Sequence, residues 1–252
     1  MRFDKQTVLV TGGSRGIGRE IAKGFAARGA QVAVHFNSNE KATQQTLDQL
    51  AGTGHFALRA DLADSDQVQR MVDEAAARMG RLDILVNNAG IHEERLLTEC
   101  SYAEWGQHFS RVLGVNLIGA ANTMHCAARH MIRQGGGRIV NISSRGAFRG
   151  EPTAPAYGAS KAALNSLGQS LAKLLAPHNI FIGAVAPGFV QTDMAAERLA
   201  AAGGDEIRAQ SPLGRVAKPQ EVAYAALFLA SAGAEFTTGT IIDVNGASYL
   251  RS

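Results

Sequence analysis

A tyrosine and a lysine that follows it four positions later, Tyr157 and Lys161, are the residues of this sequence best suited to acid–base chemistry. On a helix this spacing places both side chains on one face, so the ammonium group lies near the phenol. A neighbouring cation favours the tyrosinate and lowers the pKa of the phenol from its ordinary value of about 10. We therefore expect Tyr157 to exchange a proton with a substrate. The other tyrosines have no lysine at this spacing: Tyr102, Tyr224 and Tyr249.

A glycine-rich segment, Thr11–Gly18 with the sequence TGGSRGIG, follows a short apolar run near the start of the chain. Glycines at a strand-to-helix turn let the chain bend sharply and let a pyrophosphate approach the backbone, with its charge facing the helix N-terminus. The spacing GxxxGxG is one residue longer than the usual GxGxxG fingerprint, and the GK[ST] of a P-loop is absent. Taken alone, the segment fits either a dinucleotide site or a plain structural turn.

Short apolar runs that alternate with longer amphipathic runs form the framework that must position these residues. They predict strands at Thr7–Val10, Gln31–Phe36, His55–Arg59, Ile84–Asn87, Arg138–Ile142, Phe181–Ala186 and Thr240–Val244. They predict helices at Ile17–Arg28, Glu40–Leu50, Ser65–Met79, Val112–Gln134, Tyr157–Ala176 and Pro219–Ala230.

This unbroken alternation predicts an α/β fold of the Rossmann type: one doubly wound parallel sheet of about seven strands with helices on both faces. Because no linker, repeat or low-complexity tract interrupts the pattern, we expect a single domain over residues 1–252. The segment AAERLAAAGGD, Ala195–Asp205, is rich in small residues, and we expect residues 195–210 to form a mobile lid.

Two further polar residues are singled out by their place in this framework. Ser144 lies thirteen residues before Tyr157, at the end of the fifth predicted strand, where the carboxyl ends of parallel strands form the site of such sheets. Ser143 is an adjacent hydroxyl of similar reach. Asn116 lies in an otherwise apolar helix, and burying an amide without partners is costly.

The ordered set of TGGSRGIG, NNAG at 87–90, Asn116, Ser144, YGASK at 157–161 and PGFVQT at 187–192 resembles the short-chain dehydrogenase/reductase family from Thr7 to Gly246. The sequence is most similar to the branch of bacterial 3-oxoacyl-[acyl-carrier-protein] reductases. The resemblance implies reduction of a carbonyl group in which Tyr157 donates the proton and Ser144, rather than Ser143, hydrogen-bonds the substrate oxygen. It also implies that Lys161 holds the nicotinamide ribose and that Asn116 holds a water of a proton relay. A purely structural polar contact of Asn116 is the alternative.

A set of cofactor-binding residues follows from the same resemblance. Besides Tyr157 and Lys161 it comprises Gly12, Ser14, Arg15, Gly16, Ile17, Gly18, Asn37, Ser38, Asp61, Leu62, Asn88, Ala89, Gly90, Pro187, Gly188, Val190 and Thr192. In the family the residue matched by Asp61 hydrogen-bonds the adenine amino group, although a role in a turn fits Asp61 equally well. Thr192 matches a hydroxyl near the pyrophosphate and the carboxamide of nicotinamide. Asn87 is expected to tie neighbouring strands together.

The end of the second predicted strand bears on the choice between NADP and NAD. An enzyme that prefers NAD usually carries an acidic residue there for the ribose 2′-hydroxyl, whereas NADP requires a cation and no carboxylate. This sequence has His35, Phe36, Asn37 and Ser38, with no acid before Glu40. We therefore expect NADP(H) to be preferred and NAD(H) to be possible, with Arg15 reaching the 2′-phosphate unless it is only a solvated loop cation.

The residues expected to line the substrate pocket are His92, Arg145, Phe148, Arg149, Phe189, Met194 and Leu199. The two loop arginines suit an anionic substrate such as phosphopantetheine, or are merely solvated. Arg129 and Arg133 share a helical face and suit an acidic acyl-carrier protein. A reductase dedicated to a carrier protein is expected to have basic residues directly before residues 137–139 and before Ile180. These positions are not basic in this sequence, which argues against that role.

The predicted function is NADPH-dependent reduction of 3-oxoacyl thioesters. A sugar, polyol, steroid or other small-alcohol dehydrogenase of the same family is the alternative. A non-catalytic dinucleotide sensor is a weaker alternative, because a sensor has no use for an intact set of Asn116, Ser144, Tyr157 and Lys161.

Composition excludes several other classes. The chain is 46% hydrophobic with a net charge of only +3, and its Lys and Arg residues form no run that would follow a nucleic-acid backbone. The cysteines, Cys100 and Cys126, form no CxxC pair, so neither a metal site nor a disulfide framework is predicted. No signal peptide or membrane span is recognisable, and we expect a cytoplasmic protein that acts on a small molecule or an acyl thioester. The family implies a homotetramer.

Overall fold

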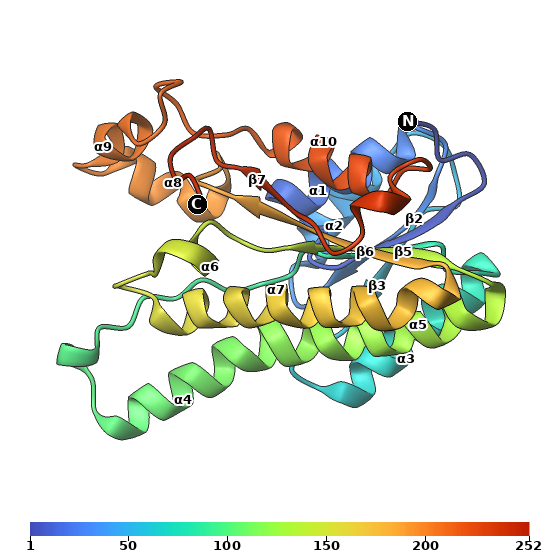
Figure 1. The fold of residues 1–252 in the computed structure, drawn as a ribbon, viewed down its shortest axis with the longest axis horizontal. Coiled ribbons are helices and arrows are strands. Elements are labelled where there is room, and N and C mark those ends of the chain that lie inside the picture. Colours follow the sequence, from blue (N-terminus) through green and yellow to red (C-terminus); the bar gives the residue numbers. More distant parts are fainter. Residues whose placement is uncertain (252) are drawn as a thin grey trace.

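Seven parallel strands form one sheet in the order β3-β2-β1-β4-β5-β6-β7 in the computed structural model (Figure 1). The structure describes residues 1–251, without the side chains of Asp193, Met194 and Glu197. The strands are β1 (Thr7–Val10), β2 (Gln31–Phe36), β3 (Phe56–Arg59), β4 (Ile84–Asn87), β5 (Gly137–Ile142), β6 (Ile180–Pro187) and β7 (Ile241–Val244). The predicted fold class is confirmed, and each strand begins and ends within one residue of the predicted positions.

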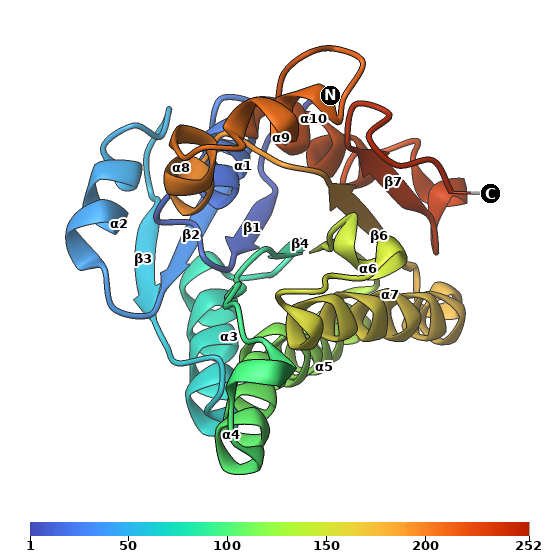
Figure 2. The same ribbon diagram turned by 90° about the vertical axis from the view of Figure 1, so that its left-hand side faces the viewer.

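Helices cover both faces of this sheet (Figure 2). One face carries α1 (Gly16–Ala26), α2 (Glu40–Leu47) and α10 (Pro219–Leu229), and the other carries α3 (Ser65–Met79), α4 (Tyr102–Leu113), α5 (Ala120–Gln134) and α7 (Pro155–Leu175). Successive side chains of a strand point to opposite faces. Val8 and Val10 of β1 therefore belong to the core under α1 and α10, whereas Leu9 belongs to the core under α3, α5 and α7.

The predicted helix Val112–Gln134 is wrong in its start and in its continuity. Helix α4 begins ten residues earlier, where Ser101 and Glu104 form a capping box, and a π-helical turn, η2 (Gly114–Gly119), separates it from α5. The S-x-x-E pattern was available in the sequence as a start signal. This turn packs closely on the segment after β3, because a β-carbon at Gly119 would lie 2.6 Å from the carbonyl oxygen of Leu62.

Several short helices were not predicted. They are α6 (Gly146–Arg149), α8 (Asp193–Ala200), α9 (Gly204–Ala209) and the 3₁₀ turns η1 (Leu97–Glu99), η3 (Ala176–His178) and η4 (Glu235–Thr237). The segment expected to form a lid is thus largely helical, as α8 and α9. In the described part of the chain, no helix has the length and apolar character needed to cross a membrane.

Candidate active site

The carboxyl ends of β1 and β4 lie side by side where the strand order reverses, which is the usual binding position in such sheets. Gly12 follows β1 with φ +62°, and a β-carbon there would lie 2.8 Å from the Cα of Ala89. The hydroxyl of Thr11 accepts hydrogen bonds from the backbone N–H groups of Asn88 and Ala89, both at 3.0 Å. The Asn88 amide donates to the carbonyl oxygens of Thr11 and Gly12. The glycine turn and the NNAG segment therefore form one rigid unit.

His35 supports this unit in a way that the sequence analysis missed. Its Nδ1 accepts a hydrogen bond from the Gly12 N–H at 3.1 Å, so its Nε2 donates to the carbonyl oxygen of Ala60 at 3.0 Å. Burial lowers the pKa of His35 and keeps the ring neutral, as this pair of bonds requires. The only signal in the sequence was a histidine in an otherwise apolar strand.

The edge of the sheet at β2 and β3 holds the residues expected near the adenosine half of a dinucleotide. Asn37 and Ser38 are exposed at the end of β2. Arg59 is exposed at the end of β3 and donates from Nε to the carbonyl oxygen of Asn37 at 3.0 Å, which adds a cation that the sequence analysis missed. Asp61 accepts a hydrogen bond from the Ala63 N–H at 2.9 Å, so it does form the expected turn, and its second carboxylate oxygen leaves the adenine role open. Leu62 is buried.

The glycine turn leaves Arg15 exposed at the start of α1. Ser14, beside it, is held through its carbonyl oxygen by Arg19 at 2.8 Å and by Thr46 at 3.0 Å. The Gly13 N–H donates to the carbonyl oxygen of His35 at 3.0 Å, which joins the turn to the end of β2. The glycine turn therefore adjoins the carboxyl end of β2, with Arg15 two residues beyond the joining bond.

The segment after β6 meets the glycine turn from the other side. A β-carbon at Gly16 would lie 3.2 Å from the Cγ2 of Thr192. The Gly188 N–H donates to the carbonyl oxygen of Val244. Val190 is buried and forms an isolated parallel β-bridge with Ala217. These contacts place the PGFVQT segment, from Pro187 to Thr192, opposite the first turn of α1, which contains Ile17 and the buried Gly18.

Ser144, Tyr157 and Lys161 come together at the carboxyl end of β5. The Ser144 hydroxyl lies close enough to the Tyr157 phenol to favour its ionised form, and it accepts a hydrogen bond from the Gly146 N–H at 3.0 Å. The Lys161 ammonium lies 5.8 Å from the centre of the Tyr157 ring and donates to the carbonyl oxygen of Ile142 at 2.8 Å. A β-carbon at Gly90 would lie 3.3 Å from the Lys161 Nζ, so the cofactor side and the catalytic side adjoin.

The pKa values of Tyr157 and Lys161 are shifted differently from the expectation that the lysine lowers the pKa of the tyrosine. Burial raises the pKa of Tyr157, and the nearby Ser144 hydroxyl only partly opposes this shift. Burial lowers the pKa of Lys161 from 10.5 to about 8. The expected lowering of the tyrosine pKa is therefore wrong for this arrangement, because desolvation of both groups outweighs the attraction of an ammonium that hydrogen-bonds a carbonyl oxygen instead of the phenol.

Asn116 lies in the π-helical turn with its side chain buried. Its Oδ1 accepts from the Ile91 N–H at 2.8 Å, and its Nδ2 donates to the Ile91 carbonyl oxygen at 3.0 Å and to the Ser160 hydroxyl at 3.1 Å. The side chain therefore ties the segment after β4 to helix α7. This is the structural contact weighed above as the alternative. Asn87 ties β4 to β5 through Asn141, at 3.0 Å, as expected.

The residues expected around the substrate divide into two groups. The His92 ring lies edge-on to Tyr157, 4.7 Å between ring centres, and burial together with the nearby Arg198 lowers its pKa. Arg149 is exposed and pairs with Glu151 at 3.5 Å. Arg145, by contrast, is 3% exposed and donates to the Ser248 hydroxyl at 2.6 Å, so the expectation of a solvated side chain is wrong. Phe148, Phe189 and Leu199 are half-buried, on α6, on the β6–α8 segment and on α8. The Met194 side chain lies outside the described residues.

Among the residues that the structure describes, no group of three or more His, Cys, Asp and Glu side chains is arranged to hold a metal ion. The site is built from hydroxyl, amide and ammonium groups and from a turn of backbone N–H groups. This donor set suits proton transfer and the binding of a phosphate-containing cofactor.

Comparisons with known proteins agree with this arrangement. The family described as "Enoyl-(Acyl carrier protein) reductase" matches residues 12–247. The chain is 38% identical over 247 residues to the 3-oxoacyl-[acyl-carrier-protein] reductase FabG of Staphylococcus aureus, covering 97% of this chain and 98% of the relative. It is 40% identical to the FabG of Aquifex aeolicus, covering 99% of each chain.

Two solved structures have the same fold over nearly the whole chain. A dehydrogenase/reductase from Sinorhizobium meliloti has a TM-score of 0.91 at 34% identity, covering 99% of this chain and 97% of the other. A short chain dehydrogenase from Burkholderia cenocepacia, solved in complex with NADP, has a TM-score of 0.87 at 34% identity and covers 98% and 99%.

Proposed function

The chain belongs to the short-chain dehydrogenase/reductase family of oxidoreductases, and we propose that it reduces 3-oxoacyl thioesters to 3-hydroxyacyl thioesters with NADPH. The observation that carries the proposal is the close approach of Ser144 and Tyr157 beside the buried ammonium of Lys161. This pair lies next to a glycine turn that approaches the NNAG segment too closely for a side chain.

Tyr157 is suited to giving a proton to a carbonyl oxygen. Because burial raises its pKa, the phenol is protonated at neutral pH and is ready for the reduction direction. The Ser144 hydroxyl, which lies near the phenol, can donate to the same substrate oxygen and stabilise the negative charge that develops there. Lys161 then supplies a positive charge that favours the tyrosinate left after the transfer.

The residues present fit a nicotinamide dinucleotide. Gly12 and Gly13 donate their N–H groups to His35, whereas the first N–H groups of α1, which a helix leaves without internal partners, can bind a pyrophosphate. Thr192 stands across the turn from Gly16, and Lys161 adjoins Gly90, so both can reach the nicotinamide half. When bound, the reduced nicotinamide supplies the hydride for the carbonyl carbon.

The preference for NADP over NAD is supported by charge at the edge of the sheet. No carboxylate follows β2 before Glu40, Arg59 hydrogen-bonds Asn37, and Arg15 is exposed in the glycine turn. A 2′-phosphate gains from these cations, whereas a 2′-hydroxyl lacks the carboxylate that usually accepts its hydrogen bond. The B. cenocepacia relative, solved with NADP, supports the same assignment.

The acyl-carrier form of the substrate is supported by the names of the relatives and by a basic helix face. Arg129 and Arg133 are exposed on α5. Arg133 also contacts the Nδ1 of His130 at 3.0 Å, and His130 pairs with Asp73 at 2.6 Å, so part of the positive charge on this face is offset. An acidic carrier protein is expected to dock here by long-range attraction that does not alter the chemical step.

A small hydroxylated ketone is the second candidate substrate. Polar groups stand around Tyr157: His92 lies edge-on to its ring, and Arg198 of α8 pairs with Glu94 at 3.2 Å beside it. Such groups suit a sugar or polyol better than a long acyl chain. The Arg198–Glu94 pair also supports residues 195–210 as the lid that closes over the substrate.

The substrate classes are separated by a spectrophotometric screen with NADPH and NADH. Acetoacetyl-CoA, an acetoacetyl-carrier protein, and small ketones and sugars are the substrates to compare. We expect NADPH-dependent reduction of the acetoacetyl thioesters, and reversal of both charges in Arg129→Glu/Arg133→Glu should raise KM tens-fold for the carrier-bound form only. If the double variant reduced both thioesters with wild-type efficiency, and a small ketone were a far better substrate than either thioester, the chain would be assigned to the small-alcohol dehydrogenases instead.

We also expect a cytoplasmic homotetramer, as is usual in the family. The apolar side chains of Ile132 on α5 and Leu174 on α7 are 41% and 65% exposed, which supports an interface on these helices.

A further inference from the structure

Arg145 is a buried cation without a matching anion. The residue is 3% exposed, although burying a guanidinium is unfavourable unless a carboxylate pairs with it. Among the described residues no carboxylate lies within ion-pairing distance. Its Nη1 donates to the Ser248 hydroxyl at 2.6 Å, and its Cζ lies 5.4 Å from the centre of the Phe189 ring. Burial and the nearby Arg149 lower the pKa of Arg145, and the charge of Glu151, which pairs with Arg149, only partly opposes this shift.

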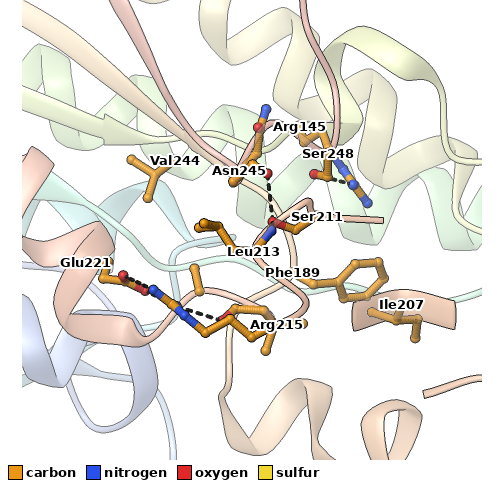
Figure 3. A pocket seen from close by; sticks show the side chains of 13 residues that line it. Arg145, Phe189, Ile207, Ser211, Leu213, Arg215, Glu221, Val244, Asn245 and Ser248 are labelled. Atoms are coloured by element: carbon orange, nitrogen blue, oxygen red, sulfur yellow. Dashed lines mark hydrogen bonds and ion pairs between the residues drawn. The ribbon is translucent and has the colours of Figure 1, made fainter. Parts of the chain in front are cut away.

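The Arg145 side chain lines a cavity of about 90 Å³ between α9, the start of α10 and the segment after β7 (Figure 3). Two other charged side chains line it, Arg215 and Glu221, and they offset each other through two hydrogen bonds of 2.7 Å. Ser211 and Asn245 add polar groups to the wall. The described lining therefore carries one uncompensated positive charge.

This cavity is separate from the proposed catalytic centre. Its described lining contains none of Asn116, Ser144, Tyr157 and Lys161. Its walls come instead from Arg145, Phe189, residues 207–221 and residues 244–248, which are four segments distant in sequence. A molecule bound here would connect these segments without touching the substrate carbonyl.

We propose that this cavity binds a small oxyanion, a phosphate or a carboxylate, through the guanidinium of Arg145. A guanidinium presents parallel N–H groups that match two oxygens of such an anion. A water needs about 10–15 Å³ of cavity volume, so the cavity of about 90 Å³ has room for a small oxyanion. The competing explanation is purely structural, with Arg145 serving only to hold the C-terminal segment through Ser248.

Binding of inorganic phosphate to the full chain tests the proposal. Isothermal titration and thermal unfolding are carried out with NADP⁺ in excess, so that the anion site of the glycine turn is filled. We expect one saturable phosphate site per chain and a rise in Tm of several degrees at saturation. Acetate and sulfate titrations show whether carboxylate or tetrahedral anions bind more tightly.

Three variants separate the two explanations. Arg145→Met should abolish phosphate binding, whereas the matched change Arg149→Met, at an exposed arginine, should preserve it. Ser248→Ala removes the structural hydrogen bond but keeps the guanidinium, so phosphate should still bind. If Arg145→Met does not fold, Arg145→Lys retains the charge without the paired N–H groups and should weaken phosphate binding about tenfold.

The proposal is overturned if the wild-type protein binds none of phosphate, sulfate and acetate saturably. It is also overturned if Arg145→Met or Arg145→Lys binds phosphate as tightly as the wild type, or if Ser248→Ala abolishes binding in a folded protein. Because no readout depends on turnover, an incorrect substrate assignment would leave these results unchanged.

Discussion

Lys161 is expected to make the folded protein more stable at alkaline pH than at neutral pH. Burial lowers its pKa from 10.5 to about 8, and the residue is only 4% exposed, so solvent screening is small. Between these two pKa values the unfolded chain binds more protons than the native one, and stability therefore rises with pH. Linkage with these values gives a gain of about 2 kcal/mol between pH 8 and pH 10.

The gain is measured as a difference between proteins. Urea unfolding followed by circular dichroism gives the free energy of unfolding at both pH values for the wild type and for Lys161→Met, a variant of similar side-chain length without the titrating group. Subtraction removes the contributions of other groups that titrate equally in both proteins. The range stops at pH 10 because the raised pKa of Tyr157 makes stability fall at higher pH.

A matched control lies on the same helix. Lys173 of α7 is exposed, and Lys173→Met should retain the wild-type pH dependence. All samples are compared at one protein concentration, because subunit association would change apparent stability. If Lys161→Met also gained about 2 kcal/mol between pH 8 and pH 10, desolvation of Lys161 would not be the cause, and our explanation of the site's electrostatics would fail.

Other predictions concern catalysis, the cofactor and assembly. Tyr157→Phe should lower kcat by 10²–10⁴ while cofactor binding measured by NADPH fluorescence stays near normal, because only the proton donor is lost; retention of more than a few per cent of the wild-type rate would contradict the role of Tyr157. Arg15→Ala should weaken NADPH much more than NADH, and Asn37→Asp should move preference toward NADH, whereas equal effects of Arg15→Ala on both cofactors would make Arg15 only a loop cation. Light scattering at micromolar concentration should give the mass of a tetramer, and a monomer mass would remove that prediction.

The sheet was predictable from the sequence because its strands are short apolar runs separated by long amphipathic ones. A strand buried on both faces, such as β1 with Val8 and Leu9 in different cores, needs apolar residues at every position, and that pattern is visible without a structure. The start of α4 was missed although its capping box was present, since the sequence analysis gave more weight to the apolar run after Leu113 than to Ser101 and Glu104.

The proximity of Tyr157 and Lys161 was predictable from the sequence, but the electrostatics of the two groups were not. The spacing of Tyr157 and Lys161 places them on one helix face, but it does not indicate how completely both groups are removed from water. The sign of a pKa shift depends on the balance of desolvation and attraction, and in this site Lys161 hydrogen-bonds Ile142, so desolvation dominates.

Arg145 illustrates the same limit for charged residues outside the motifs. In the sequence it is one of two arginines near Ser144, and nothing in the residue types distinguishes it from Arg149. Their environments diverge because α6 begins directly after Arg145, with Arg149 in its last turn, so one side chain enters the cavity beside Ser248 and the other reaches solvent and Glu151. A buried cation costs folding free energy, and a cavity that leaves it without a counter-ion is more easily explained if an anion from solution supplies the missing charge.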